Sequence, residues 1–167
     1  SSSGLISTPV QTISAGTNWK EVTCGYNNFT VAIKTDNTLW AWGHNGFGEL
    51  GTNDQTHRSS PTQIGSNTTW KLVSAGFYHT AAIKTDGTLW TWGKNDIGQL
   101  GDNSITHRSS PIQTVSGGTN WKILSVGEDN TASIKTDGTF WSWGRNTYGQ
   151  IGVYDVLHRS SPVQEIT

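Results

Sequence analysis

The sequence lacks several features that mark common classes of protein. It contains no Met, even at position 1, so we expect a processed chain or a fragment of a longer one. Its single cysteine, Cys24, cannot form an internal disulfide, which excludes a disulfide framework. No apolar run approaches the roughly 20 residues that a membrane span needs. With 11 Lys and Arg residues and no basic run, the long-range field that attracts nucleic acid or anionic lipid is missing.

Charged residues of either sign are also scarce. They make up 14% of the 167 residues, whereas Ser, Thr and Asn together number 54, and the formal net charge is −1. Such a neutral, hydroxyl-rich surface is common among secreted bacterial β-proteins, so we expect an extracellular or cell-surface protein. Two glycosylation sequons begin at Asn28 and Asn67, and they are informative only if the source glycosylates secreted proteins.

An internal repeat organises the whole chain. Trp19, Trp70 and Trp121 are spaced by 51 residues, and the motif HRSSP recurs at 57–61, 107–111 and 158–162. The sequence therefore predicts an N-terminal tail with a leading strand at 7–12 (residues 1–18), followed by three repeats at 19–65, 66–116 and 117–167.

Each repeat contains the signals of four short strands. In HTAAIKTDGTLWTWG (79–93) two β-rich runs flank Asp86-Gly87, which predicts a hairpin with a type I′ turn. Further strands are expected at 70–76 and 110–115. Alternation along 89–92 places Trp90 and Trp92 on one face and Leu89 and Thr91 on the other. A small sheet flanked by similar sheets buries both faces, so the repeat predicts an all-β protein with four-stranded antiparallel propeller blades, of which about three are present.

The glycines of LWAWGHNGFGELG (39–51) raise the alternative of a phosphate-binding loop, because Gly46, Gly48 and Gly51 spell G-x-G-x-x-G. A dinucleotide site needs a helix directly after that loop. Here a turn-rich segment follows, and the sister repeats carry Asp96 and Thr147 in place of Gly46. We therefore expect tight turns at these glycines and no cofactor.

The pattern VSAGFYHTAAIKTDGTLWTWGKNDIGQLGDNSITHRSSPIQ closely resembles the RCC1 (regulator of chromosome condensation) repeat, and it recurs over essentially the whole chain. The resemblance, in particular to bacterial members, implies a β-propeller of usually seven blades with about 50 residues per blade. Known members include an exchange factor for the small GTPase Ran and a secreted β-lactamase inhibitor. This sequence has no insertion comparable to the exchange factor's β-wedge. The family's His after AGxx is His79 here, replaced by Phe29 and Asn130 in the other repeats.

Chemistry-bearing residues are present, but their pattern favours structural roles. His57, His107 and His158 occupy equivalent positions on three blades, too far apart for one metal ion. We expect them, and the adjacent Arg58, Arg108 and Arg159, to hydrogen-bond within the loops. Asp36, Asp86 and Asp137 belong to the hairpin turns. Cys24 aligns with Ala75 and Val126, so we expect it to be buried. The sequence thus predicts no catalytic residue, no metal site and no enzyme.

Loop sequences differ between repeats while strand positions recur, as expected when function resides in loops. The connections between the first and second and between the third and fourth strands should share one face of the propeller. The candidate binding face consists of Tyr26, Phe29, Phe47, Phe77, Tyr78, His79, Glu128, Asp129, Tyr148 and Tyr154. Aromatic side chains there would anchor a protein or glycan partner.

Three functions are consistent with the sequence: a binding or structural module, a regulator of nucleotide exchange on a small GTPase, and an inhibitor of an enzyme such as a β-lactamase. We favour the first, with no nucleic acid partner and no membrane span. Three blades leave the faces of the two end blades open. We therefore expect the chain to be part of a longer protein or to join identical copies.

Overall fold

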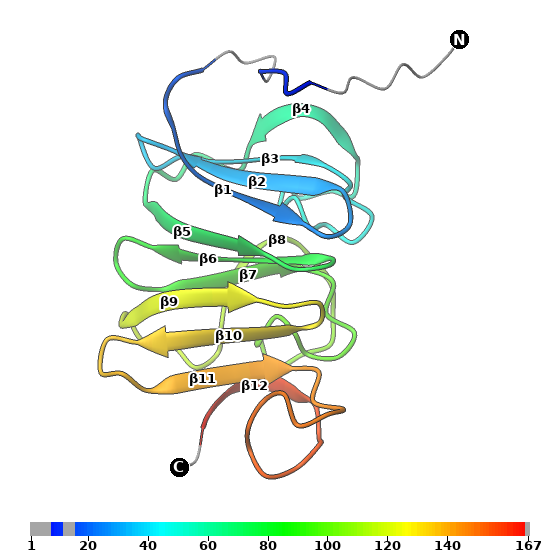
Figure 1. Ribbon diagram of the computed structural model, residues 1–167, viewed down its shortest axis with the longest axis vertical. Helices are drawn as coiled ribbons and strands as arrows, with labels where there is room; N and C mark the ends of the chain where they lie inside the picture. Colours follow the sequence, from blue (N-terminus) through cyan, green and yellow to red (C-terminus); the bar gives the residue numbers. More distant parts are fainter. Residues whose placement is uncertain (1–7, 12–15, 166–167) are drawn as a thin grey trace.

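The computed structural model describes residues 8–11 and 16–165. These residues form twelve strands in three four-stranded antiparallel sheets, stacked one after another (Figure 1). We name the sheets blades 1, 2 and 3 in chain order. Blade 1 contains β1 (Trp19–Gly25), β2 (Phe29–Lys34), β3 (Leu39–Gly43) and β4 (Arg58–Gln63). Blade 2 contains β5 (Trp70–Ala75), β6 (His79–Lys84), β7 (Leu89–Gly93) and β8 (Arg108–Gln113). Blade 3 contains β9 (Trp121–Val126), β10 (Asn130–Lys135), β11 (Phe140–Gly144) and β12 (Arg159–Gln164).

The all-β blade architecture predicted from the repeat is confirmed. In every blade the strands pair in chain order, and the described part of the chain contains no helix. Accordingly, none of the described residues belongs to a helix that is long and apolar enough to cross a membrane. The loop after Gly51 leads to strand β4, so the helix that a dinucleotide site requires does not follow these glycines. Of the leading strand expected at 7–12, residues 8–11 are not in a strand, and residues 7 and 12 lie outside the described residues.

The hairpin between the second and third strands of each blade differs from the predicted type I′ turn. Gly87 has a φ of 79°, but Asp86 is not among the residues with positive φ. The N–H of Gly87 donates to the carbonyl of Lys84 at 2.9 Å, which is the pattern of a type I turn followed by a left-handed glycine. Asp86 Oδ1 accepts hydrogen bonds from the hydroxyl of Thr88 at 2.7 Å and its N–H at 3.0 Å. These bonds fix the turn and hold the pKa of Asp86 below its usual value.

Two hydrophobic cores lie between consecutive blades. One joins residues of blade 1, including Val31, Ile33 and Leu50, to Trp70 and Trp92 of blade 2. The other joins blade 2 to blade 3 through Ala81, Ile83, Leu89, Trp121 and Trp143. Blade 2 is therefore covered on both faces, as the alternation of Trp92 and Leu89 predicted. The small side chains of Ala81 and Ala82, both fully buried, keep the middle strand thin enough for this packing.

The first strands β1, β5 and β9 lie next to one another along the stack, and the blades fan out from them (Figure 1). The connections β1–β2 and β3–β4, and their equivalents in blades 2 and 3, lie on one side of the stack, and the tight hairpins lie on the opposite side (Figure 1). We call the first side the loop face. The prediction that these loops share one face is therefore confirmed.

Candidate aromatic binding site on the loop face

Four aromatic rings from three loops come together on the loop face. Tyr26 stacks on Phe77 with ring centroids 6.5 Å apart, and Phe77 in turn contacts Tyr78 at 4.5 Å. Phe47 meets Tyr78 edge to face at 4.8 Å. We call these four residues the aromatic row. It crosses from blade 1 to blade 2, and Tyr26 at its end is 78% exposed.

The aromatic row borders a hollow on the same face. The hollow has a volume of about 380 Å³ and is lined by Tyr26, Phe77, Val126, Gly127 and Glu128. Glu128, another predicted site residue, is exposed there. The aromatic surface is therefore continuous with a hollow to which residues of all three blades contribute.

Tyr148 and Tyr154 are exposed, at 88% and 85%, but they do not join the aromatic row. Both lie in the β11–β12 loop of blade 3. Within the described residues neither ring pairs with another aromatic ring. They remain single exposed tyrosines on a different part of the face.

Three predicted site residues are buried, so their assignment to a binding face was wrong. Phe29 is 2% exposed and belongs to the core between blades 1 and 2. His79 is fully buried and its Nε2 lies 3.0 Å from the hydroxyl of Thr131 in blade 3. Both residues begin the second strand of a blade, where the neighbouring blade covers the side chain. Asp129 is 5% exposed.

The burial of His79 has an electrostatic consequence. Removal from water, reinforced by the positive charge of Lys94, lowers the pKa of His79 from 6.5 to about 3. The imidazole is therefore neutral at physiological pH. It acts as an uncharged link between blades 2 and 3.

Asp129 is the centre of a small ion-pair network beside the aromatic row. Arg145 Nη2 lies 2.8 Å from Asp129 Oδ2, and Lys94 Nζ lies 3.7 Å from Oδ1. Lys94 also contacts Asp96 at 3.2 Å, and its ammonium lies 5.7 Å from the Tyr78 ring centroid. The buried carboxylate is thus paired with two cations, which offset the cost of burying its charge.

The three loop histidines are structural in the same way in every blade. The N–H of Asn95 donates to His107 Nδ1 at 2.9 Å, and Asn95 Oδ1 accepts from the N–H of Leu100 at 2.9 Å. The Asn95 amide also donates to the carbonyls of Ser104 and Thr106, both at 3.1 Å. Blades 1 and 3 repeat the asparagine–histidine bond with Asn45 and His57, and with Asn146 and His158.

These buried asparagines were not predicted as important from the sequence, although their recurrence in WGxN was a visible signal. Each fastens the long loop between the third and fourth strands.

The arginines that follow the three loop histidines pair with aspartates of the same loop: Arg58 with Asp54, Arg108 with Asp102, and Arg159 with Asp155. No group of three or more His, Cys, Asp or Glu side chains within residues 8–11 and 16–165 is arranged to hold a metal.

Cys24 corrects another expectation, because it is exposed and not buried. Its equivalent in blade 2, Ala75, is 7% exposed because blade 1 covers it. In the described residues no blade packs on that side of blade 1. The alignment identified the correct strand position, but burial there depends on a neighbouring blade.

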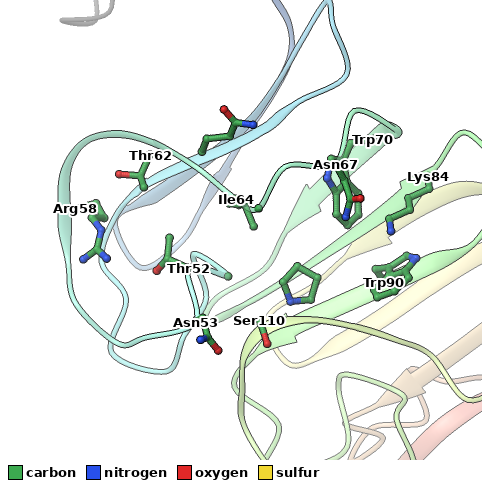
Figure 2. Close-up of a pocket in the computed structure, with 14 residues that line it drawn as sticks. Thr52, Asn53, Arg58, Thr62, Ile64, Asn67, Trp70, Lys84, Trp90 and Ser110 are labelled. Carbon is green, nitrogen blue, oxygen red and sulfur yellow. The ribbon is translucent and has the colours of Figure 1, made fainter.

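A groove between blades 1 and 2 is a second candidate site that the sequence did not predict (Figure 2). It has a volume of about 450 Å³, and Asn53, Asn67, Trp70, Lys84 and Trp90 are among its lining residues. The Lys84 ammonium lies 3.8 Å from the Trp90 ring centroid and 4.9 Å from that of Trp70. Partial burial lowers the pKa of Lys84, which Asp86 partly opposes. Because Lys84 already occupies the indole surface, the groove is less suited to stacking a ligand than the aromatic row.

The fold and the loop face define a segment of a β-propeller whose polar loop residues are largely used in holding the loops. Sequence comparison gives the family. The family model described as "Regulator of chromosome condensation (RCC1) repeat" matches residues 36–83 and 86–134. A second model of the same repeat matches residues 19–49, 70–99 and 121–150. The chain belongs to the RCC1 repeat family.

A curated relative is the ultraviolet-B receptor UVR8 of Arabidopsis thaliana, which is 32% identical over 138 residues. The match covers 81% of this chain and 31% of the receptor, so the chain spans about a third of that relative. The matches at 36–83 and 86–134 each run from the hairpin of one blade into the second strand of the next. The sequence repeat and the structural blade are therefore out of phase.

Solved structures give the same architecture. Prp20p from Saccharomyces cerevisiae, a protein described with its binding properties to Gsp1p and histones, aligns with a TM-score of 0.80 at 20% identity. The alignment covers 90% of this chain and 39% of Prp20p. Human WBSCR16 aligns with a TM-score of 0.77 at 20% identity over 87% of this chain and 37% of its own. At these identities the likeness shows the fold alone.

Proposed function

We propose that this chain is a non-enzymatic propeller module that binds a protein partner through the aromatic row. The observation that carries the proposal is the contact between rings of different blades, in which Tyr26 of blade 1 stacks on Phe77 of blade 2 at 6.5 Å. Large rings held against one another present apolar area at little cost in side-chain entropy. The exposed Tyr26 adds a hydroxyl that suits a partly polar partner.

The use of the other polar groups supports a binding role over catalysis. Asp129 is paired with Arg145 and Lys94, and His107 accepts a backbone N–H. A general base must instead be free to reach a substrate proton. On the loop face, the groups left available for contact are aromatic rings and exposed loop atoms.

Related folds support a protein as the partner. One solved structure with a TM-score of 0.78 is yeast RCC1 (Prp20) bound to Kap60. Because the identity is 21% and the alignment covers 37% of that protein, we do not infer that this chain binds Kap60. What we take from it is that a protein with an RCC1-type fold binds another protein.

The proposal is tested by selecting short random peptides displayed on phage against the immobilised chain. Enriched peptides are synthesised, and their affinity is measured by fluorescence anisotropy. We expect the double variant Tyr26→Ser, Phe77→Ser to bind them about tenfold or more weakly, which is a loss of about 1.4 kcal/mol or more. The matched control is Tyr154→Ser, which removes an equally exposed tyrosine away from the aromatic row and should bind as the parent does.

Equal affinity of the parent and the double variant for every enriched peptide would refute the aromatic row as the binding site. A glycan array probed with the same three proteins separates the two partner classes. Saturable glycan binding lost only in the double variant would replace the protein partner with a carbohydrate.

A further inference from the structure

The groove between blades 1 and 2 contains a buried hydrogen-bond donor that has no acceptor. Trp70 lines this groove and is 2% exposed, and its Nε1 makes no hydrogen bond with any described residue. Trp90 lines the same groove, but its Nε1 donates to the hydroxyl of Thr88 at 2.9 Å. Native proteins seldom leave a buried N–H unpaired, so the Trp70 indole is open to an acceptor that enters the groove.

The equivalent tryptophan of blade 3 has the acceptor that Trp70 lacks. Trp121 Nε1 donates to the carbonyl of Gly117 at 3.2 Å. Gly117 belongs to the link between β8 and β9, residues 114–120. The link between β4 and β5, residues 64–69, is one residue shorter, and none of its carbonyls accepts from Trp70. The unpaired N–H is therefore a local property of the contact between blades 1 and 2.

The shorter link also leaves the groove open. In the longer link, the N–H of Val115 donates to the carbonyl of Gly101 at 3.0 Å. The equivalent residues Gly65 and Gly51 make no such bond, and both line the groove. The groove of about 450 Å³ therefore includes a space that a backbone hydrogen bond closes in the next blade.

The charges of the lining residues favour a negatively charged ligand. Arg58 and Lys84 are the cations among the described residues that line the groove, and no Asp or Glu is among them. Arg58 is already paired with Asp54 at 2.6 Å. Lys84 forms no ion pair in the described part of the chain, although Asp86 attracts it from farther away. The groove thus has one positive charge that no ion pair compensates.

We propose that the groove between blades 1 and 2 binds a carboxylate, which accepts a hydrogen bond from Trp70 Nε1 and pairs with the Lys84 ammonium. Lys84 Nζ lies 4.9 Å from the Trp70 ring centroid, so one ligand can contact both groups. Figure 2 shows Trp70, Lys84 and Trp90 along one side of the groove. The exposed side chains of Asn67 and Ser110 also line it and can donate to the second carboxylate oxygen.

A carboxylate fits these groups better than a phosphate or a sugar does. It carries one negative charge, which the single uncompensated ammonium balances, whereas a phosphate monoester carries about −1.5 to −2 at neutral pH. Its two oxygens accept hydrogen bonds from separate donors. A sugar would need an open ring face, and Lys84 Nζ covers the Trp90 ring at 3.8 Å from its centroid.

The groove does not depend on the two end surfaces of the described chain. Its lining residues run from Gly51 to Pro111 and belong to blade 1, blade 2 and the link between them. Blade 2 is covered on both faces, so a further blade at either end would pack on blade 1 or blade 3 and leave the groove as it is. None of the four rings of the aromatic row lines it. The proposal therefore stands independently of the protein-binding function proposed above.

Titration with propionate, followed by NMR of the indole N–H groups, tests the site. The isotope-labelled 167-residue chain has nine tryptophans, whose N–H signals are assigned individually. We expect propionate at neutral pH to move the Trp70 signal downfield in a saturable way, because a new acceptor deshields the proton. The Trp121 signal is the internal control, because the Gly117 carbonyl already accepts from that N–H. Propionamide and sodium chloride at the same concentrations should leave both signals in place.

Two lysine variants test the role of the charge. Lys84→Met removes the ammonium but keeps an unbranched side chain over Trp90, and it should weaken propionate binding about tenfold or more. Lys135→Met is the matched control. Lys135 Nζ lies 4.0 Å from the Trp141 ring centroid in the same arrangement, but Lys135 does not line the groove. This variant should bind propionate as the parent does.

Two sources can supply the carboxylate, a free small acid or an acidic side chain of a protein, and blocked tripeptides separate them. One tripeptide has a central glutamate and the other a central glutamine. If the glutamate peptide binds more tightly than propionate, acidic protein segments are the ligand. Binding equal to or weaker than that of propionate assigns the groove to free acids. The glutamine peptide should not move the Trp70 signal in either case.

Three results would overturn the proposal. The first is a Trp70 signal that propionate does not shift saturably, which would leave water as the acceptor. The second is an equal response to propionamide or to chloride, which would mean that the groove takes any acceptor or any anion. The third is a folded Lys84→Met variant that binds propionate as tightly as the parent. The titration of the parent is decisive even if that variant does not fold.

Discussion

The indole N–H of Trp92 in blade 2 donates a 2.9 Å hydrogen bond to the backbone carbonyl of Glu49 in blade 1. The two residues are 43 positions apart, and both are fully buried. The bond holds the Trp92 indole of blade 2 against the β3–β4 loop of blade 1. It therefore couples blade packing to the loop that carries Phe47.

Replacement of Trp92 should lower the stability of the fold. Trp92→Ala removes a fully buried ring and its hydrogen bond, so we expect the free energy of unfolding to fall by about 3–5 kcal/mol. Trp42→Ala removes the same residue type from a half-buried site and should cost clearly less in the monomer. Urea unfolding at low protein concentration compares the two. Equal losses would contradict the difference in burial.

Two glycines of the hairpin turns form a matched pair. Gly87 and Gly138 have φ angles of 79° and 86°, so alanine at either site pays about 1–2 kcal/mol for the left-handed backbone. At Gly87 a Cβ would also collide with the backbone carbonyl of Thr119, whereas at Gly138 no atom lies within 4 Å. We expect Gly87→Ala to cost at least about 1–3 kcal/mol more than Gly138→Ala. Thermal unfolding of both variants measures this difference, and similar melting temperatures would disprove it.

The buried Asn95 should control the order of its loop. Asn95→Ala leaves the N–H of Leu100 and the carbonyls of Ser104 and Thr106 without their side-chain partner, at a cost of about 1–3 kcal/mol or more. Hydrogen exchange should become faster for residues 100–107. The exposed Asn67→Ala serves as the control and should leave that exchange unchanged. Protection equal to that of the parent would show that the loop holds its shape without the asparagine.

The lowered pKa of His79 predicts a pH-dependent stability. In the unfolded chain the group titrates near 6.5, and in the folded chain near 3, so the unfolded state binds more protons between these values. Stability from this site is complete above pH 7 and falls as the pH drops below 6.5. We expect a loss of about 2 kcal/mol between pH 7.5 and pH 5.

The variant His79→Asn isolates this effect, because Asn130 occupies the equivalent position of blade 3. The other four histidines remain and provide the background. The variant should lose less stability than the parent on acidification in urea titrations at the two pH values. Identical losses would argue against a buried neutral imidazole.

Much of the fold could be predicted because strands and hairpins depend on patterns that extend over only a few residues. Alternation and Asp86-Gly87 located the hairpin whose strands are His79–Lys84 and Leu89–Gly93. The turn type was predicted incorrectly, because a type I′ turn needs positive φ at both Asp86 and Gly87, and only Gly87 has it. Positions in loops predicted exposed rings at Tyr26 and Tyr148, which are exposed, and also at Phe77 and Tyr78, which are half-buried.

The sequence by itself determined which segments of each repeat form strands, to within a few residues, how they pair within a blade, and that the blade is repeated three times. Those features depend on side-chain alternation and turn residues within one repeat. Only the tertiary structure decided which equivalent positions are buried. Val22 and Val73 are the same residue at the same strand position, yet they are 65% and 7% exposed. The difference arises because burial is a property of the neighbouring blade, which the local sequence of a strand does not encode.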